Sequence, residues 1–197
     1  MTLDAKPRPD LLAAIVAATK TAVQDRAVAK PLRELEKARG QKISDGKRFI
    51  TELRKEDRYN VIAECKRRSP SKGVLSETYN PSDIATGYAN AGAAAISVLT
   101  EPAFFDGELE HLEAVRNAVD LPVLRKDFIV TDYQLLEACV AGADAVLLIA
   151  AILDASELRH LMQQAKGYGL AVLTEVHDAE DLSRSLEAGA DIVGVNN

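Results

Sequence analysis

Two kinds of segment alternate along the chain from residue 61 onward, and this alternation limits the possible folds more than any other feature. The first kind is a short run of apolar and β-branched residues, typical of a parallel strand covered on both faces. The second repeats its apolar residues at the spacing of an amphipathic helix. The predicted strands are 61–65, 94–100, 122–128, 145–151, 171–176 and 192–195, and the predicted helices are 81–92, 107–119, 132–142, 156–169 and 178–189. The pattern therefore predicts an α/β fold built on a parallel sheet.

A short motif recurs where helices give way to strands. Ala-Gly-Ala begins at Ala91, Ala141 and Ala188, and glycine at such a position is a common helix stop. The spacing corresponds to two βα units of about 25 residues each, as in a (β/α) barrel or an open doubly wound sheet. Because six strands are predicted and a complete barrel has eight, we expect about six βα units.

The first part of the chain has a different pattern. It contains three predicted helices, at 10–30, 32–40 and 44–54, and no predicted strand. Pro31 and Gly40 separate the helices, and Asp45 or Ser44 is the expected N-cap of the third. We therefore expect an N-terminal helical extension over residues 1–58 and an incomplete (β/α) barrel over residues 59–197.

The composition excludes several classes of protein. With 47% hydrophobic and 27% charged residues, the chain has the composition of a packed globular protein and not of a disordered one. It has no apolar run of about 18 residues, and its N-terminus lacks the pattern of a secretory signal. Cys65 and Cys139 match no zinc or redox spacing. We therefore expect a protein of the reducing cytoplasm, without a membrane span.

The charge distribution points to a small anionic ligand. The net charge is −6, yet basic residues cluster at 66–72 and again at Arg125 and Lys126. Such clusters in an acidic chain suggest a site for a small anion. No nucleic-acid partner is expected, because there is no long basic stripe with interleaved aromatic residues.

Polar residues stand where the predicted strands end, which is where parallel βα folds place their functional groups. Glu64 and Lys66 are two residues apart and so project to the same side of their strand. Lys126 and Glu175 end other strands and would complete a mixed-charge cluster suited to general acid–base catalysis. Apolar residues at the remaining strand ends would supply a wall for an aromatic group.

Each of these features also has a purely structural interpretation. Glu64 and Lys66 are equally consistent with an ordinary ion pair, and residues 67–73 with a solvated loop. Lys126 with Asp127, taken alone, is more often structural than catalytic. His177 is interpreted as a helix-start residue, because no second His or Cys stands at metal-ligand spacing, and no metal site is predicted. Only the joint placement of the four charged residues favours a catalytic site.

At these same residues the sequence resembles the indole-3-glycerol phosphate synthase family. The segment AECKRRSPSKG, at 63–73, is similar to the first-strand signature of that family. The resemblance covers nearly the whole chain, including the segment that resembles the family's N-terminal helices. It continues in ISVLTEPAFFDG (96–107), in residues 121–149, in LAVLTEVHD (170–178) and in IVGVNN (192–197).

The resemblance implies a fold, a reaction and a set of site residues. The fold is a TIM (β/α)8 barrel, and the enzyme is a carbon–carbon lyase that needs no cofactor. It closes the ring of 1-(2-carboxyphenylamino)-1-deoxyribulose 5-phosphate to give indole-3-glycerol phosphate in tryptophan biosynthesis, with loss of carbon dioxide and water. Lys126 is implied as the general acid and Lys66 as a phosphate contact and second acid. The remaining implied residues are Glu64 and Glu175 as bases that hold the lysines, Asn196 and Ser69 as substrate contacts, and Pro70, Phe105, Phe128 and Leu147 as pocket lining.

The family pattern extends past Asn196 into a further strand and a phosphate loop that this sequence does not contain. We therefore expect the 197-residue chain by itself to be inactive and to self-associate through the open edge of its barrel. Two alternatives stay open: a half-barrel subunit that needs a complementing chain, and an isomerase of a phosphoribosyl substrate on the same fold.

Overall fold

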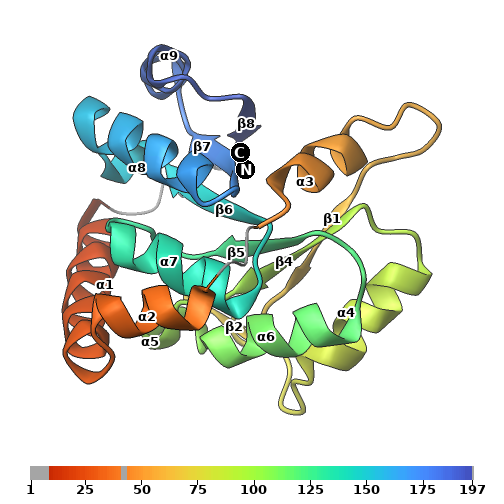
Figure 1. Cartoon of the computed structure of the whole chain (residues 1–197). Helices are drawn as coiled ribbons and strands as arrows, with labels where there is room; N and C mark the ends of the chain where they lie inside the picture. The colour runs from red at the N-terminus through yellow and green to blue at the C-terminus, as the bar shows by residue number, and fades with distance from the viewer. Residues whose placement is uncertain (1–8, 41–43, 197) are drawn as a thin grey trace, which may run out of the picture.

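The structure is a computed structural model that describes residues 9–40 and 44–196. Predictions that fall on residues 1–8, residues 41–43 or Asn197 lie outside the described residues. Three helices come first, and βα units follow them (Figure 1). The helices are α1 (Pro9–Ala29), α2 (Leu32–Arg39), α3 (Gly46–Leu53), α4 (Pro81–Asn90), α5 (Pro102–Phe105), α6 (Leu109–Ala118), α7 (Asp132–Ala141), α8 (Ala155–Gly167) and α9 (Ala179–Ala188).

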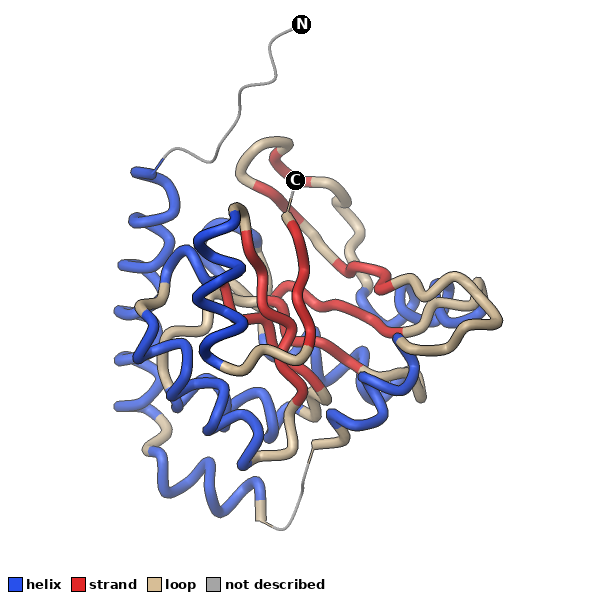
Figure 2. The backbone as a smooth tube through the Cα atoms, turned by 90° about the horizontal axis from the view of Figure 1, so that it is seen from above, coloured by secondary structure: helices blue, strands red, loops and turns tan. Residues whose placement is uncertain are grey.

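The main sheet confirms the predicted strands and their parallel arrangement. Its strands are β1 (Ile62–Cys65), β4 (Ala95–Leu99), β5 (Val123–Lys126), β6 (Ala145–Ile149), β7 (Ala171–Val176) and β8 (Ile192–Val195). They pair in this order, each parallel to the next. Helices run along the outside of the strands (Figure 2). The arrangement is that of consecutive βα units in a TIM barrel, as the helix and strand pattern predicts.

Three small elements were not predicted. A two-residue hairpin pairs β2 (Arg68–Ser69) with β3 (Gly73–Val74) after the first strand. The short helix α5 follows β4, where the Glu101 side chain accepts three backbone N–H bonds at its start. A 3-10 turn spans Ala150–Ile152. Each is too short to show a period, so its signal lies in caps and turns, which the sequence pattern does not resolve.

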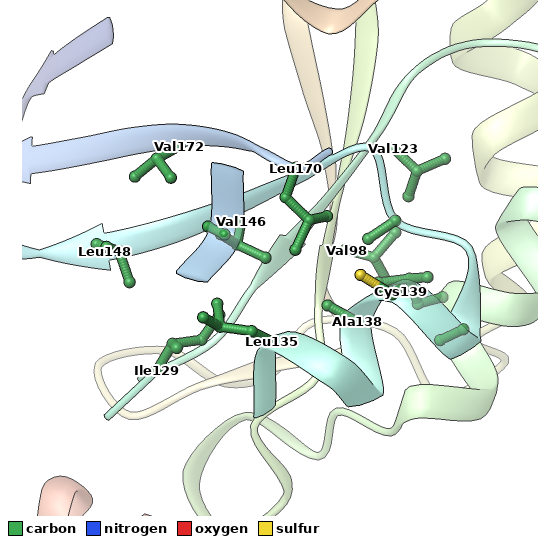
Figure 3. Close-up of a cluster of buried hydrophobic side chains, with 14 of the residues drawn as sticks. Val98, Val123, Ile129, Leu135, Ala138, Cys139, Val146, Leu148, Leu170 and Val172 are labelled. Carbon is green, nitrogen blue, oxygen red and sulfur yellow. The ribbon is translucent and has the colours of Figure 1, made fainter. Parts of the chain in front are cut away.

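Side-chain alternation divides each strand between two cores. Residues on the outer face pack against the helices, and Figure 3 shows Val98, Val146 and Leu148 beside Leu135 and Cys139 of α7. Residues on the inner face form a smaller cluster toward the amino ends of the strands. Its buried members are Phe49 of α3 and Ala95, Leu124, Ala145 and Ala171 of four strands. The helix α3 therefore closes the amino end of the sheet from within.

The other two N-terminal helices lie against α7. Val23 of α1 and Leu35 of α2 pack with Tyr133 and Leu136 in a third buried cluster. The Tyr133 hydroxyl also lies 3.0 Å from the carbonyl oxygen of Arg26, near the end of α1. The predicted helices are confirmed to within two residues at their described ends, whereas the domain boundary at residue 58 stays a prediction. Across the described residues, none of the helices has the length and hydropathy needed to cross a membrane.

Gly46 determines how closely α3 approaches the sheet. Its backbone N–H donates to the carbonyl of Gly169 at 2.9 Å. A Cβ atom at this position would lie 2.6 Å from that same oxygen and would also collide with the backbone at Leu170 and Ala171. Because the colliding atoms are backbone, α3 would have to move away from the cluster around Phe49.

Gly46→Ala is therefore expected to lower the free energy of unfolding by about 1–3 kcal/mol, the usual cost of overpacking. Gly87→Ala is the matched control, since Gly87 lies on the exposed face of α4 and a Cβ there meets no atom. That control should raise stability by about 0.5–1 kcal/mol. Urea denaturation followed by circular dichroism measures both. Equal midpoints for the two variants would contradict the close approach described for α3.

Candidate active site

The inner-face residues change from apolar to charged toward the carboxyl ends of the strands. Along β1 the inner positions are Ile62 and Glu64, and along β5 they are Leu124 and Lys126. Glu175 occupies the corresponding place on β7, and Asn196 follows β8. The same alternation that buries the apolar residues at one end thus gathers polar side chains at the other.

Glu64 is the centre of the charged cluster. Its Oε1 lies 2.5 Å from Lys66 Nζ, and its Oε2 lies 3.2 Å from Lys126 Nζ. Partial burial acts to raise the pKa of the Glu64 carboxyl, but Lys126 and Lys66 outweigh that effect and hold its pKa below the ordinary value. Glu64 is therefore ionised at neutral pH and keeps both ammonium groups at the same site.

Glu175 has different partners from those expected. The resemblance implied that it would help to hold the two lysines, and this is wrong for the described structure, where both lysines pair with Glu64. Instead, Asn196 Nδ2 donates to Glu175 Oε1 at 2.9 Å, and His177 Nε2 lies 3.6 Å from the same oxygen. Glu175 thus pairs with residues that follow its own strand and the neighbouring strand β8.

His177 belongs to this group, which the sequence interpretation missed. It precedes the N-cap of α9, as expected of a helix-start residue, yet its Nε2 lies 3.2 Å from Asn196 Nδ2 and its ring lines the cavity. The available signal was its spacing: His177 is two residues after Glu175 and so continues the same face of the strand.

A cavity of about 250 Å³ opens above the charged cluster. Phe105 and Phe128 form one wall, with ring centroids 6.1 Å apart. Leu11, Leu12 and Ile15 of α1 form another, and no sequence pattern had linked that helix to the site. The remaining lining residues are Glu64, Lys66, Pro70, Leu99, Lys126, Asp127, Leu147, Ile149, Glu175, His177 and Asn196.

Ser69 is the one predicted site residue that does not line this cavity. It is buried in the β2–β3 hairpin, where its Oγ accepts the backbone N–H of Lys72 at 3.3 Å. The hydroxyl thus closes the turn of the hairpin. Pro70, the next residue, lines the cavity in its place.

The prediction that Arg125 and Lys126, at the end of β5, act together in an anion site is wrong. Arg125 and Lys126 are adjacent, so their side chains project to opposite faces of the strand. Lys126 enters the cavity, whereas Arg125 is fully buried behind the sheet and bonds to Asp127 and Glu137. From the basic cluster at 66–72, only Lys66 lines the cavity.

The arrangement is suited to polar chemistry on a small molecule with an aromatic part. Two ammonium groups can donate protons or bind a developing negative charge, and the Glu175 carboxylate can accept a proton. The apolar walls can enclose an aromatic ring and exclude water from it. Fold and cluster together define the class: a TIM-barrel protein with its site at the carboxyl ends of the strands.

Comparison with known proteins identifies the family within that class. The sequence profile of indole-3-glycerol phosphate synthase matches residues 12–197, so the chain belongs to the indole-3-glycerol phosphate synthase family. The indole-3-glycerol phosphate synthase of Sulfurimonas denitrificans is 53% identical over 142 residues, which are 72% of this chain and 54% of that protein. That of Nocardioides sp. is 57% identical over 137 residues, 70% of this chain and 53% of that protein. The chain spans about half the length of the curated relatives it matches.

Lys126→Met is expected to raise the pKa of the Glu64 carboxyl, because the variant removes the strongest charge that stabilises the carboxylate. Carbon-13 NMR of the Glu64 carboxyl as a function of pH measures the change. Lys166→Met is the control, since Lys166 pairs with Asp191 in an exposed ion pair away from the cavity. A Glu64 pKa that is the same in Lys126→Met as in the wild type would show that Lys126 does not face Glu64.

Proposed function

We propose that the protein is an indole-3-glycerol phosphate synthase, a carbon–carbon lyase (EC 4.1.1.48) of tryptophan biosynthesis. Its substrate is then 1-(2-carboxyphenylamino)-1-deoxyribulose 5-phosphate, and its products are indole-3-glycerol phosphate, carbon dioxide and water. The observation that carries this proposal is Glu64 between two lysines, at the floor of a cavity with a wall of two phenylalanines. Family membership and the match to the relatives support it.

Lys126 is the proposed general acid of ring closure. In this step the ring carbon that bears the carboxylate forms a bond to the substrate carbonyl carbon, and the carbonyl oxygen takes up negative charge. An ammonium group placed at that oxygen stabilises the charge and then supplies the proton. Glu64 Oε2 lies 3.2 Å from Lys126 Nζ, so the acid is oriented before the substrate reacts.

The later steps need a second acid and a base. Carbon dioxide leaves as the electrons of its bond restore the aromatic ring. The new hydroxyl then takes a proton and departs as water, while a base removes a proton from the neighbouring carbon. Lys66 is the proposed second acid and phosphate contact, and Glu175 is the proposed base, oriented by Asn196. Because every step moves electron pairs and protons only, no redox cofactor is required.

The apolar wall is the proposed binding surface for the anthranilate ring. Phe105, Phe128, Leu147 and Pro70 line one part of the cavity, and α1 lines another. A ring enclosed in this way is removed from contact with water. Removal from water favours the conversion of its charged carboxylate into neutral carbon dioxide. We also place the protein in the cytoplasm, which fits the two free and buried cysteines. Self-association through the edge strands of the sheet stays a prediction.

Lys126→Ala in the full-length gene product is expected to lower kcat at least about a hundredfold, as for removal of a general acid, with a smaller effect on KM. Lys126→Arg should fail as well, because the guanidinium holds its proton and has a different shape. The assay follows formation of indole-3-glycerol phosphate, and Lys166→Ala should retain wild-type kcat. Near-normal kcat in Lys126→Ala would exclude Lys126 as the acid, and absence of product from the wild-type enzyme would exclude the proposed function.

Lys66→Ala is expected to raise KM and also to lower kcat, because Lys66 is proposed both to contact the phosphate and to act in a late step. Arg68→Ala is the control from the same segment, since Arg68 is exposed and lies 3.7 Å from Asp106 outside the cavity. The same steady-state assay measures both variants. If Arg68→Ala were as damaging as Lys66→Ala, the phosphate would contact the hairpin and not the end of β1.

A further inference from the structure

A second charged cluster lies behind β5, on the face opposite Lys126. Its centre is the fully buried guanidinium of Arg125. Arg125 Nη2 donates to Asp127 Oδ2 at 2.8 Å, and Arg125 Nε donates to Thr100 Oγ1 at 3.1 Å. Arg125 Nη1 donates to the carbonyl of Gln134 at 2.7 Å, and both terminal nitrogens lie 3.3 Å from Glu137 Oε2. Every nitrogen of the guanidinium thus has a partner.

The cluster is balanced in charge. Glu137 of α7, which is 4% exposed, also accepts from Arg26 of α1, at 2.6 Å from Nε and 3.1 Å from Nη2. Two guanidiniums therefore face two carboxylates, Asp127 and Glu137. Buried charges that are paired and fully bonded in this way fix geometry, but they add little stability compared with apolar residues of the same volume.

The bonds of the cluster lie on both sides of Lys126 along the chain. Arg125 is held before it, and Asp127 is held after it, with Asp127 Oδ1 accepting the N–H of Phe128 at 2.8 Å. The carbonyl of Lys126 itself accepts the N–H of Thr100 at 3.1 Å. The backbone that carries the ammonium group therefore has little freedom, although the side chain stands partly open to the cavity.

We propose that Arg125 is a positioning residue for Lys126: the buried Arg125–Asp127–Glu137–Arg26 cluster holds the end of β5 so that the ammonium group meets Glu64 and the reacting oxygen. The catalytic part of this inference rests on the proposed function. The structural part, that Arg125 maintains the contact between Lys126 and Glu64, does not depend on which reaction the site performs.

Two variants of the full-length gene product test the proposal. Arg125→Met removes the charge and the five donors at nearly constant length. Thr100→Val keeps the charges of Arg125 and Asp127 but removes the Thr100 hydroxyl. That hydroxyl donates to Asp127 at 2.7 Å and accepts from Arg125. Thr100→Val therefore decides the question if Arg125→Met does not fold.

Arg116→Met is the matched control. Arg116 forms a part-buried ion pair with Asp144 at 2.9 Å, and Asp144 accepts the N–H of Val123 at the start of β5. The control thus breaks a part-buried ion pair beside the start of the same strand, at the end away from the cavity. A purely structural role for Arg125 would give the two arginine variants the same behaviour once each is folded.

In Arg125→Met, kcat is expected to fall about tenfold or more with less than about a threefold change in KM, since misplacement of an acid by a fraction of an ångström slows the chemical step. In Thr100→Val, kcat should fall about threefold. In both variants the pKa of Glu64, measured by carbon-13 NMR, should rise as Lys126 moves away from it. Arg116→Met should keep the wild-type kcat and the wild-type Glu64 pKa.

The Glu64 pKa distinguishes this proposal from the proposed function. If kcat and the Glu64 pKa in both test variants equal those of Arg116→Met, the positioning role is wrong. If the wild-type enzyme forms no indole-3-glycerol phosphate, yet the Glu64 pKa rises in the test variants and not in the control, Arg125 positions Lys126 in an enzyme of another reaction.

Discussion

The alternation of side chains along the parallel strands is the constraint on which the rest of this molecule depends. Adjacent residues of a strand must face opposite sides, so each strand serves the interior of the barrel and the helical layer at once. In β5 this separates Lys126 from Arg125, although the two residues are neighbours with the same charge. One ammonium group enters a cavity, and one guanidinium is buried against α7, within the space of a single peptide unit.

A second consequence of the alternation is that two lysines, Lys66 and Lys126, both pair with Glu64. A carboxylate between two ammonium groups leaves one positive charge in that trio, and such a charge suits the anionic substrate of the proposed function. It also lowers the pKa of Glu64, so the cluster remains charged at neutral pH. The stability that this carboxylate contributes is present at neutral pH and is lost as the pH falls through its folded-state pKa.

The sequence was sufficient to predict the features that depend on the local spacing of apolar residues. It was not sufficient for the features that depend on contacts between segments far apart in the chain. The six strands, the helices between them and the gathering of Glu64, Lys66 and Lys126 all follow from periods of 3.6 and 2 residues. The contribution of α1 to the cavity could not be predicted, because it depends on how that helix packs against α7. Ser69 was placed in the site by resemblance, whereas its hydroxyl closes a turn that is too short to leave a pattern.

The two ends of the inner face divide stability and chemistry between them. At the amino end, Phe49 and small strand residues form an apolar cluster closed by α3, and Gly46 permits the close contact. Such packing supplies free energy of folding without any polar group to satisfy. At the carboxyl end the same strands carry charges whose burial is costly. Glu64 pairs with Lys126 on the inner face of the sheet, and Glu137 pairs with Arg125 on the outer face. A (β/α) barrel can keep a charged, partly open site because the folding energy of its strands comes from their other end and their other face.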